Sequence, residues 1–141
     1  MSGESCIMEA IVIDGKNATL GRLASYSAKR ALLGREVVIV NANEIIITGR
    51  KKDILEKYKS LIKKGGSSLK GPKIVRTPER MMKRTIRGML SHKQTRGNDA
   101  LKRIRCYNEV PEEYKDVKKI KAGKEKMTKL MTLKELCVLL K

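Results

Sequence analysis

The sequence predicts an α/β fold built on a parallel β-sheet, and three observations lead to it. Residues 10–14 and 36–42 are short, continuous apolar runs rich in β-branched residues, as in strands buried on both faces. Residues 19–33, between them, carry apolar side chains at helical spacing. A strand, a helix and a strand within about thirty residues form a βαβ unit, whose strands are parallel. The 141 residues suit one domain, and without Phe or Trp its core must be aliphatic.

The first half of the chain contains this unit and the start of a second helix. The first strand ends in the turn DGKN, and the helix that follows ends at Gly34, a typical helix stop. Because residues 36–42 are continuously apolar, we expect an interior strand there. Residues 45–48 predict a further short strand or an extended link, after which Thr48 would cap a second helix. The apolar stripe of that helix is Ile54, Leu55, Tyr58, Leu61 and Ile62.

A third helix is predicted after the Gly- and Ser-rich loop of residues 65–73. It would begin with Thr77 as its cap and Pro78 at its first position. Its two faces differ in chemistry. The apolar face consists of Met81, Met82, Thr85, Ile86 and Met89, and the opposite face, about 180° away, carries Arg80, Lys83, Arg84 and Arg87.

The last third of the chain predicts a strand between two helices. A short helix near Asn98 leads into residues 103–107, RIRCY, whose alternation is typical of a half-buried strand. Residues 115–129 are rich in lysine and poor in apolar side chains, and we expect them to be mobile unless an anion orders them. Thr132 and Glu135 form a capping box for a final helix. The docking face of that helix is Leu133, Leu136, Cys137 and Leu140.

The charge of the chain points to a polyanionic partner. The net charge is +18, and residues 50–105 alone hold nineteen Lys or Arg against four Asp or Glu. A solvated helix face usually mixes both signs to form i,i+4 pairs, yet the third helix has only Glu79 near its four cations. Arginine also matches phosphate geometry well. Polyanion binding is therefore favoured over a merely solvated face.

Among polyanions, folded RNA fits best. A membrane-binding helix would carry Trp, Phe or Leu on its apolar side, whereas Met and Ile occupy that side here and are needed for the core. The chain lacks the aromatic platforms of single-strand binders, and it has no zinc finger, zipper or clear helix-turn-helix. No segment has the length of a transmembrane helix, and the N-terminus lacks a signal peptide.

Catalytic and metal sites are less well supported by the sequence. Gly15 and Gly21 have the wrong spacing for a phosphate-binding loop, and Asp14, at the end of a strand, suits a turn or a helix cap better than catalysis. His92 is the only histidine and suits either a phosphate contact or simple exposure. Cys6, Cys106 and Cys137 lack metal-ligand spacing, so we expect reduced thiols, no metal and no cofactor.

Three blocks of the sequence resemble one family when taken in order. They are IVIDGKNATLGRLAS, VVIVNANEIIITGRK and RMMKRTIRGMLSHKQTRGNDALKRIRCY. Together they cover about residues 10–115 and resemble the universal large-subunit ribosomal protein family L13. Two features resemble the archaeal and eukaryotic branch of that family. They are the direct passage from GRLAS through ALLGRE to VVIVNA and the stretch GPKIVRTPER.

The resemblance implies a three-layer α/β sandwich around a mainly parallel four-stranded sheet, with basic helix and loop extensions. It also implies a non-enzymatic, cytoplasmic constituent of the large ribosomal subunit that supports translation and subunit assembly. The implied partners are large-subunit ribosomal RNA and neighbouring ribosomal proteins, with no membrane and no small-molecule substrate. RNA contact would fall to Thr48, Gly49, Arg50, Lys51, Lys52, Arg76, Arg80, Lys83, Arg84, Arg87, His92, Lys93 and Arg96.

Two further expectations concern the path and the division of the chain. Family members usually read GMLPHK where this chain has Ser91, so proline does not fix the bend after Leu90. We expect an N-terminal tail over residues 1–9, the RNA-binding domain over 10–115, a lysine-rich extension over 116–131 and a C-terminal helix over 132–141. A nucleotide-using α/β enzyme and an RNA-binding factor that acts away from the ribosome remain as alternatives.

Overall fold

The fold is that of an α/β protein with a parallel sheet at its centre. A computed structural model describes residues 10–63, 76–121 and 129–140. Its main sheet has four strands in the order β4-β2-β1-β5, and every pair of neighbours is parallel. The strands are β1 (Ile11–Asp14), β2 (Val37–Val40), β4 (Ile104–Cys106) and β5 (Ile120–Lys121). The predicted βαβ unit and the interior position of residues 37–40 are confirmed.

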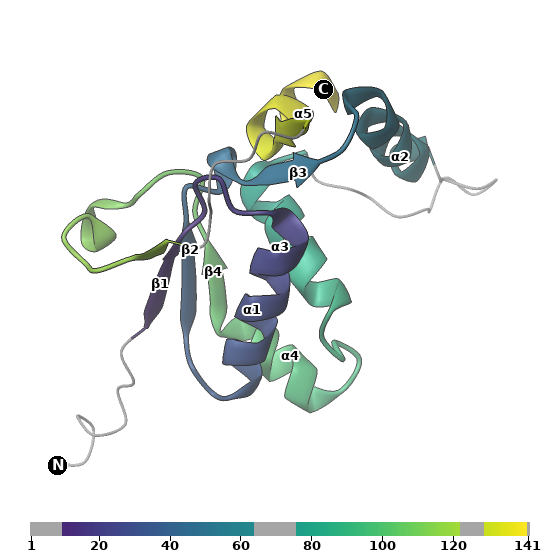
Figure 1. The fold of residues 1–141 in the computed structure, drawn as a ribbon. Coiled ribbons are helices and arrows are strands. Elements are labelled where there is room, and N and C mark those ends of the chain that lie inside the picture. The colour runs from purple at the N-terminus through teal and green to yellow at the C-terminus, as the bar shows by residue number, and fades with distance from the viewer. Residues whose placement is uncertain (1–9, 64–75, 122–128, 141) are drawn as a thin grey trace, which may run out of the picture.

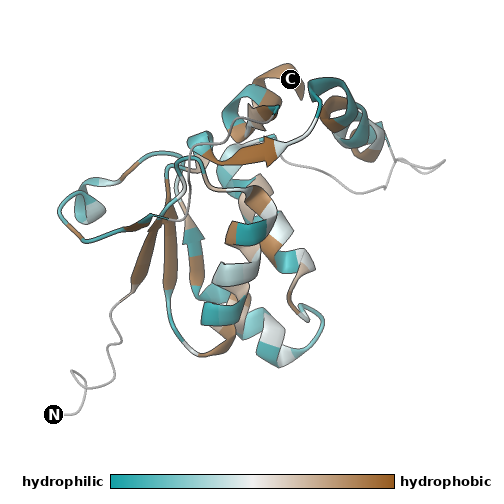
Figure 2. Ribbon diagram, viewed as in Figure 1, coloured by the Kyte–Doolittle hydropathy of each residue, from teal (hydrophilic) through white to brown (hydrophobic). Residues whose placement is uncertain are grey.

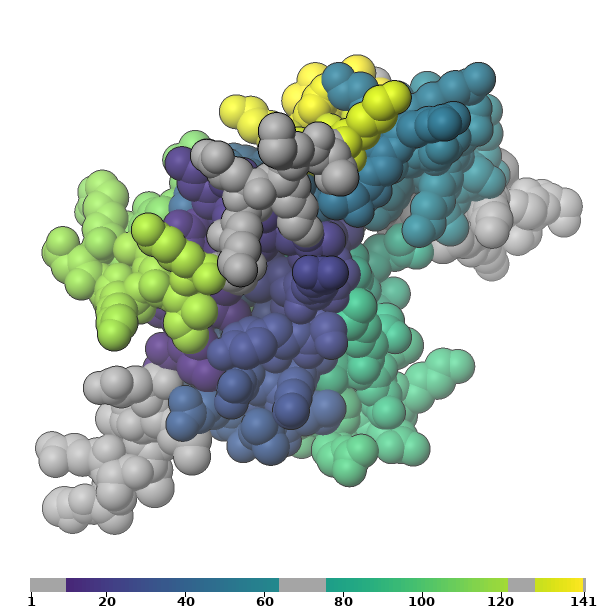
Figure 3. Space-filling view, viewed as in Figure 1, coloured from purple at the N-terminus to yellow at the C-terminus, as the bar shows by residue number. Residues whose placement is uncertain are grey.

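Three helices cover one face of this sheet and a thinner segment covers the other. The helical layer consists of α1 (Leu20–Leu32), α3 (Pro78–Gly88) and α4 (Thr95–Lys102), which lie together on the right of the sheet (Figure 1). On the opposite face, residues 107–117 contain the short 3-10 helix Glu112–Tyr114 and form a lobe of their own (Figure 3). The arrangement is consistent with the predicted three-layer sandwich.

The core is aliphatic and divided by the sheet. The strands are apolar along most of their length (Figure 2), and β2 is buried at all of its residues. Ile13, Val37 and Ile39 point into the helical side of the core, where α1 and α3 pack on them. Val12, Val38 and Val40 point to the other side and contact Tyr107 and Tyr114. Because successive strand residues alternate between faces, one short β-branched run supplies both sides.

A second, smaller sheet and two helices lie beyond the carboxyl ends of the parallel strands (Figure 1). The strands β3 (Ile46–Thr48) and β6 (Leu130–Thr132) pair antiparallel, and α2 (Lys51–Lys63) and α5 (Leu133–Leu140) pack against each other there. The backbone N–H of Glu135 donates to Thr132 Oγ1 at 3.2 Å, so Thr132 caps α5 as predicted. The predicted docking face of α5 is buried.

The predictions for Thr48 and Met89 at the ends of helices were wrong, and the prediction for Thr77 and Pro78 is confirmed in position but not in a capping bond. Thr48 does not cap α2, because it is the last residue of β3 and the Ile54 N–H donates to the carbonyl of Arg50 instead. Thr77 precedes α3 as expected but makes no capping bond, and its buried Oγ1 has no partner among the described residues. Met89 lies past the end of α3 and is 45% exposed, so it does not belong to the buried face.

The lysine-rich region also contributes more structure than its composition suggested. Ile120 and Lys121 extend the main sheet as β5, and residues 130–132 form β6. The backbone groups of Ile120 and Lys121 pair with β1, which requires no hydrophobic side chain, whereas β6 also buries Met131 in the core. The loop predicted over residues 65–73 lies outside the described residues, as does Cys6.

Candidate nucleic-acid interface

Helix α3 places a cationic face on the surface because its other face is fixed in the core. Met81 is 3% exposed, and Met82 and Ile86 are fully buried. Since these side chains set the rotation of the helix, Arg80 and Arg87 on the far side are exposed, with the half-buried Lys83 and Arg84 at its edges. The four predicted contacts therefore share one face of one helix, as their spacing indicated.

The cations of α3 have no ion-pair partner among the described residues. The ion pair found among the described residues joins Lys51 of α2 to Glu135 of α5. Within the described residues, Glu79 is the acid nearest in sequence to the α3 cations. Its backbone N–H donates a hydrogen bond to Asn108 Oδ1 at 3.1 Å. Among the described residues, no carboxylate thus pairs with an α3 cation, although Glu79 lines the same hollow as Arg80 and Lys83. The cations outnumber the acids there, which favours an anionic partner.

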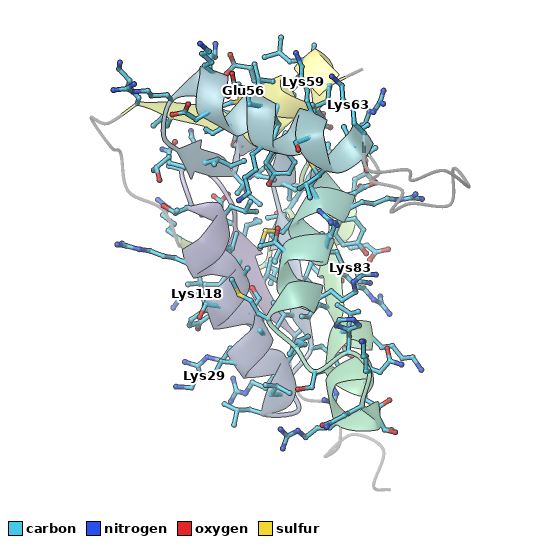
Figure 4. The ribbon with its side chains drawn as sticks, turned by 90° about the vertical axis from the view of Figure 1, so that its right-hand side faces the viewer. Lys29, Glu56, Lys59, Lys63, Lys83 and Lys118 are labelled. Atoms are coloured by element: carbon cyan, nitrogen blue, oxygen red, sulfur yellow. The ribbon has the colours of Figure 1, made fainter. Side chains whose placement is uncertain are left out.

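A hollow lies on each side of this cationic face. The larger is a pocket of about 590 Å³ between α1, α2, α3 and β3, and its cations are Arg50, Lys57 and Arg84. The smaller, about 310 Å³, borders β4, and its cations are Arg80, Lys83 and Arg105. Figure 4 shows α2 crossing above α1 and α3, and Lys83 leaving α3 on the side away from α1.

Burial near these hollows raises the pKa of two weak acids that are already mainly protonated at neutral pH. Burial raises the pKa of the Tyr58 hydroxyl, and the positive charge of Arg84 opposes that rise. Burial also raises the pKa of Cys106 to about 12, against the opposing charge of Lys83. At neutral pH, therefore, Tyr58 is a hydrogen-bond donor and Cys106 is a thiol, not a nucleophilic thiolate.

The loop of Thr48, Gly49 and Arg50 lies at the rim of the larger pocket. Gly49 adopts a φ of +131°, a conformation that a side chain would strain, and its N–H donates to the carbonyl of Lys129 at 2.9 Å. Lys51 and Lys52 begin α2 and are exposed. Because Lys51 is paired with Glu135, its charge is already partly compensated, whereas Arg50 has no such partner in the described residues.

The segment after α3 follows a tight course despite the serine at position 91. Leu90 is 5% exposed and anchors it, and the N–H of Gln94 donates to the carbonyl of Ser91 at 2.9 Å. His92 and Lys93 are exposed in this turn, as are Arg96 in the first turn of α4 and Arg76 before α3. Buried leucine and backbone bonds therefore define the bend that proline would otherwise fix.

Gly97 lies directly against the backbone of this turn. A Cβ atom there would lie 2.2 Å from the carbonyl oxygen of Ser91, so the backbone of the turn would have to move. We expect Gly97→Ala to lower the free energy of unfolding by about 1 to 3 kcal/mol, the usual range for overpacking. Urea denaturation would measure it. Gly88→Ala is the control, because in the described part of the chain no atom outside its own helix backbone and chain neighbours lies within 4 Å of its Cβ position. An equal loss in both variants would contradict the account.

Asp14, the carboxylate considered for catalysis, has a structural role. Asp14 Oδ1 accepts hydrogen bonds from the backbone N–H of Lys16 at 3.0 Å and from Asn41 Nδ2 at 2.9 Å. The carboxylate thus holds the turn after β1 to the end of β2, as the turn interpretation predicted. In the described parts of the chain, no three His, Cys, Asp or Glu side chains gather as metal ligands would. The helices described there include none that could span a membrane.

Two cations at the hollows were missed by sequence reasoning. Lys57 lies on α2 outside the three family blocks, and Arg105 lies on β4 near the end of the third block, but neither was assigned to RNA contact. Arg105 occupies the outward position of an alternating strand, and this position, together with its place in the third block, is the signal that could have indicated it. The structure brings Arg105 to the smaller hollow because β4 packs on α3, and it brings Lys57 to the larger one because that pocket lies between α2 and α3.

Fold and surface together define a small α/β protein with a strongly basic helix beside its sheet. The chain belongs to the ribosomal protein L13 family, because the family model described as "Ribosomal protein L13" matches residues 8–113. The family predicted from the three sequence blocks is therefore confirmed.

Relatives named "Large ribosomal subunit protein uL13" support this membership. That of Caenorhabditis elegans is 42% identical over 131 residues, which are 92% of this chain and 65% of the relative. That of Archaeoglobus fulgidus is 50% identical over 72% of this chain and 65% of the relative. That of Picrophilus torridus is 42% identical over 92% of this chain and 96% of the relative. The chain thus spans just under two thirds of the first two and almost all of the third, and both predicted branches are represented.

Proposed function

We propose that this protein is a structural constituent of the large ribosomal subunit that binds and stabilises folded ribosomal RNA. Its relatives carry the name of a large-subunit protein, and this chain shares their family. In this role it would lie in the cytoplasm, contact large-subunit ribosomal RNA and neighbouring ribosomal proteins, and take part in subunit assembly and translation without catalysing a reaction.

One observation carries the RNA-binding part of the proposal. Four cations occupy one face of α3, and within the described residues none of them has an ion-pair partner. Such a cluster is costly until anions neutralise it, and the regularly spaced phosphates of a folded RNA can contact several of its members at once. The exposed Arg76, His92, Lys93 and Arg96 continue the same basic surface at both ends of α3.

The loop of residues 48–52 supplies the second part of the proposed interface. Thr48, Gly49 and Arg50 share a pocket with Arg84, so the loop and α3 can contact neighbouring parts of one RNA. Lys51 and Lys52 begin the adjoining helix and are exposed. Because Glu135 already pairs with Lys51, we expect Lys51 to contribute less to RNA affinity than Arg50.

Arg84 gives a direct test of backbone contact. Arg84→Ala should weaken binding to large-subunit ribosomal RNA and lower the slope of log affinity against log salt concentration by about one ion, because one phosphate contact is lost. Filter binding over a series of salt concentrations would measure the slope. Lys59→Ala is the matched control, since Lys59 is exposed on α2 and projects away from α3 (Figure 4). An unchanged slope for Arg84→Ala would remove that residue from the interface.

Sedimentation of the cellular protein tests membership of the subunit. We expect the protein to sediment with the large subunit in a sucrose gradient and to be released from it by RNase. A soluble pool that turns over a nucleotide would instead favour an α/β enzyme. A protein bound to RNA but absent from the subunit peak would favour a factor that acts away from the ribosome.

A further inference from the structure

Gly21 is a glycine for which the fold offers no reason. It is the second residue of α1, it is exposed, and its φ is not positive. Among the described residues, and apart from the chain neighbours and backbone of its own helix, no atom lies within 4 Å of the position that a Cβ would take. Glycine in a helix interior is less favourable than alanine by roughly 1 kcal/mol, and in the first turn, where Gly21 lies, the cost has the same sign but is smaller. A residue that costs stability and serves no contact within the described structure suggests that the space beside it is used by something else.

The space beside Gly21 is the larger of the two pockets. Its volume of about 590 Å³ lies within the roughly 300 to 1,000 Å³ of pockets that hold small organic ligands. Leu20, Ile47, Ile54 and Leu61 contribute apolar surface, and Tyr58 adds an aromatic ring. A purely anionic ligand such as free phosphate would leave this apolar surface unused.

The polar groups of the same pocket suit a nucleotide. Arg50, Lys57 and Arg84 come from three different places in the chain and supply positive charge for a phosphate. Asp53 is the one acidic residue among the described lining, and its carboxylate can accept a hydrogen bond from a ribose hydroxyl or a base N–H. The pocket therefore combines positive charge for a phosphate, a hydrogen-bond acceptor for a sugar or base edge, and an apolar wall with one aromatic ring.

We propose that this pocket binds a single nucleotide of the ribosomal RNA that is turned out of its helical stack. Its base would lie against Tyr58 and the apolar wall, its phosphates would contact Arg50, Lys57 and Arg84, and its sugar or base would pass close to Gly21. Unstacked bases are commonly held in this way against aromatic and arginine side chains. The inference rests on the proposed RNA-binding function and adds to it a defined site with a single-nucleotide ligand.

The test fills the pocket without removing charge. Gly21→Leu should lower the affinity for a large-subunit ribosomal RNA transcript by roughly tenfold or more, and Gly21→Ala by less, because added volume excludes the nucleotide. The salt slope should stay unchanged, since no cation is lost, and the melting temperature should not fall, since glycine is the weaker helix former. Gly88→Ala adds the same methyl group outside the pocket and should leave affinity unchanged.

Nucleotide-resolution chemical probing of the same complexes locates the ligand. We expect one nucleotide to be protected by the natural protein and to become reactive with the Gly21→Leu protein. Normal affinity of the Gly21→Leu protein would overturn the inference while leaving the proposed function standing. Failure of the natural protein to bind the transcript would overturn the proposed function itself. Equally tight binding of free AMP, GMP, CMP or UMP would assign the pocket to a free mononucleotide and overturn the RNA assignment.

Discussion

Replacing Arg80, Lys83, Arg84 and Arg87 together with glutamine is expected to abolish most of the RNA affinity of this protein. Each cation that contacts a phosphate releases about 0.9 of a counterion, so four contacts should lower the salt slope by about 3 to 4. At about 0.15 M salt the same loss corresponds to an affinity roughly 100- to 1,000-fold weaker. Fluorescence anisotropy with a large-subunit ribosomal RNA transcript would measure both quantities. Folding should be retained, because the buried face of α3 is unchanged.

The control for this variant removes the same charge from elsewhere on the surface. Lys29, Lys59, Lys63 and Lys118 are exposed and come from three separate parts of the chain (Figure 4). Their replacement by glutamine lowers the net charge by the same amount. If RNA binding depends on the clustered face of α3, the control should bind with nearly natural affinity. Equal losses in the two variants would mean that net charge alone drives binding and that α3 has no special role.

Met82→Ala is expected to have the largest effect on stability. Met82 is fully buried between α3 and the sheet, and truncation of a buried methionine leaves a cavity that costs about 2 to 5 kcal/mol. Thermal and chemical denaturation would measure the loss of unfolding free energy. Met89→Ala is the matched control, because Met89 is 45% exposed and its truncation should change stability by less than about 0.5 kcal/mol. A normal melting transition for Met82→Ala would mean that the faces of α3 had been reversed.

These two variants separate the two faces of one helix. The glutamine variant should lose RNA binding and keep its stability, whereas Met82→Ala should lose stability and, once folded, keep its salt slope. This separation follows from the fixed rotation of α3, since Met82 and Ile86 are fully buried and Arg80 and Arg87 are exposed. A variant that lost both properties equally would indicate that folding of α3 depends on RNA.

The parallel sheet and its main helices were predictable because their hydrophobic patterns are strong and local. Residues 37–40 are continuously apolar, and the structure places them between two parallel neighbours. Ile120 and Lys121 were not predictable, because a two-residue strand is defined by backbone pairing with β1 and leaves little trace in side-chain pattern. The end of α3 was missed for a similar reason, since Met89 continues the helical spacing although the chain turns there.

The cations on α3 were predictable from the sequence, whereas those contributed by neighbouring elements were not. Helical geometry alone brings Arg80, Lys83, Arg84 and Arg87 to one face, so spacing was sufficient. Lys57 and Arg105 reach the hollows only through the packing of α2 and β4, which no local pattern encodes. The ion pair of Lys51 with Glu135 likewise depends on the docking of α5 on α2. Long-range packing thus decided which cations share a pocket.

We propose above all that the cationic face of α3 is neutralised by ribosomal RNA. The most direct measurement is a cryo-electron-microscopy map of the native large subunit that contains this protein, at a resolution that shows side chains. We expect the guanidinium groups of Arg80 and Arg87 within about 3 Å of RNA phosphate oxygens, the distance of a charge-assisted hydrogen bond. A map that shows these side chains in bulk water, or against acidic residues of a neighbouring protein, would contradict the account.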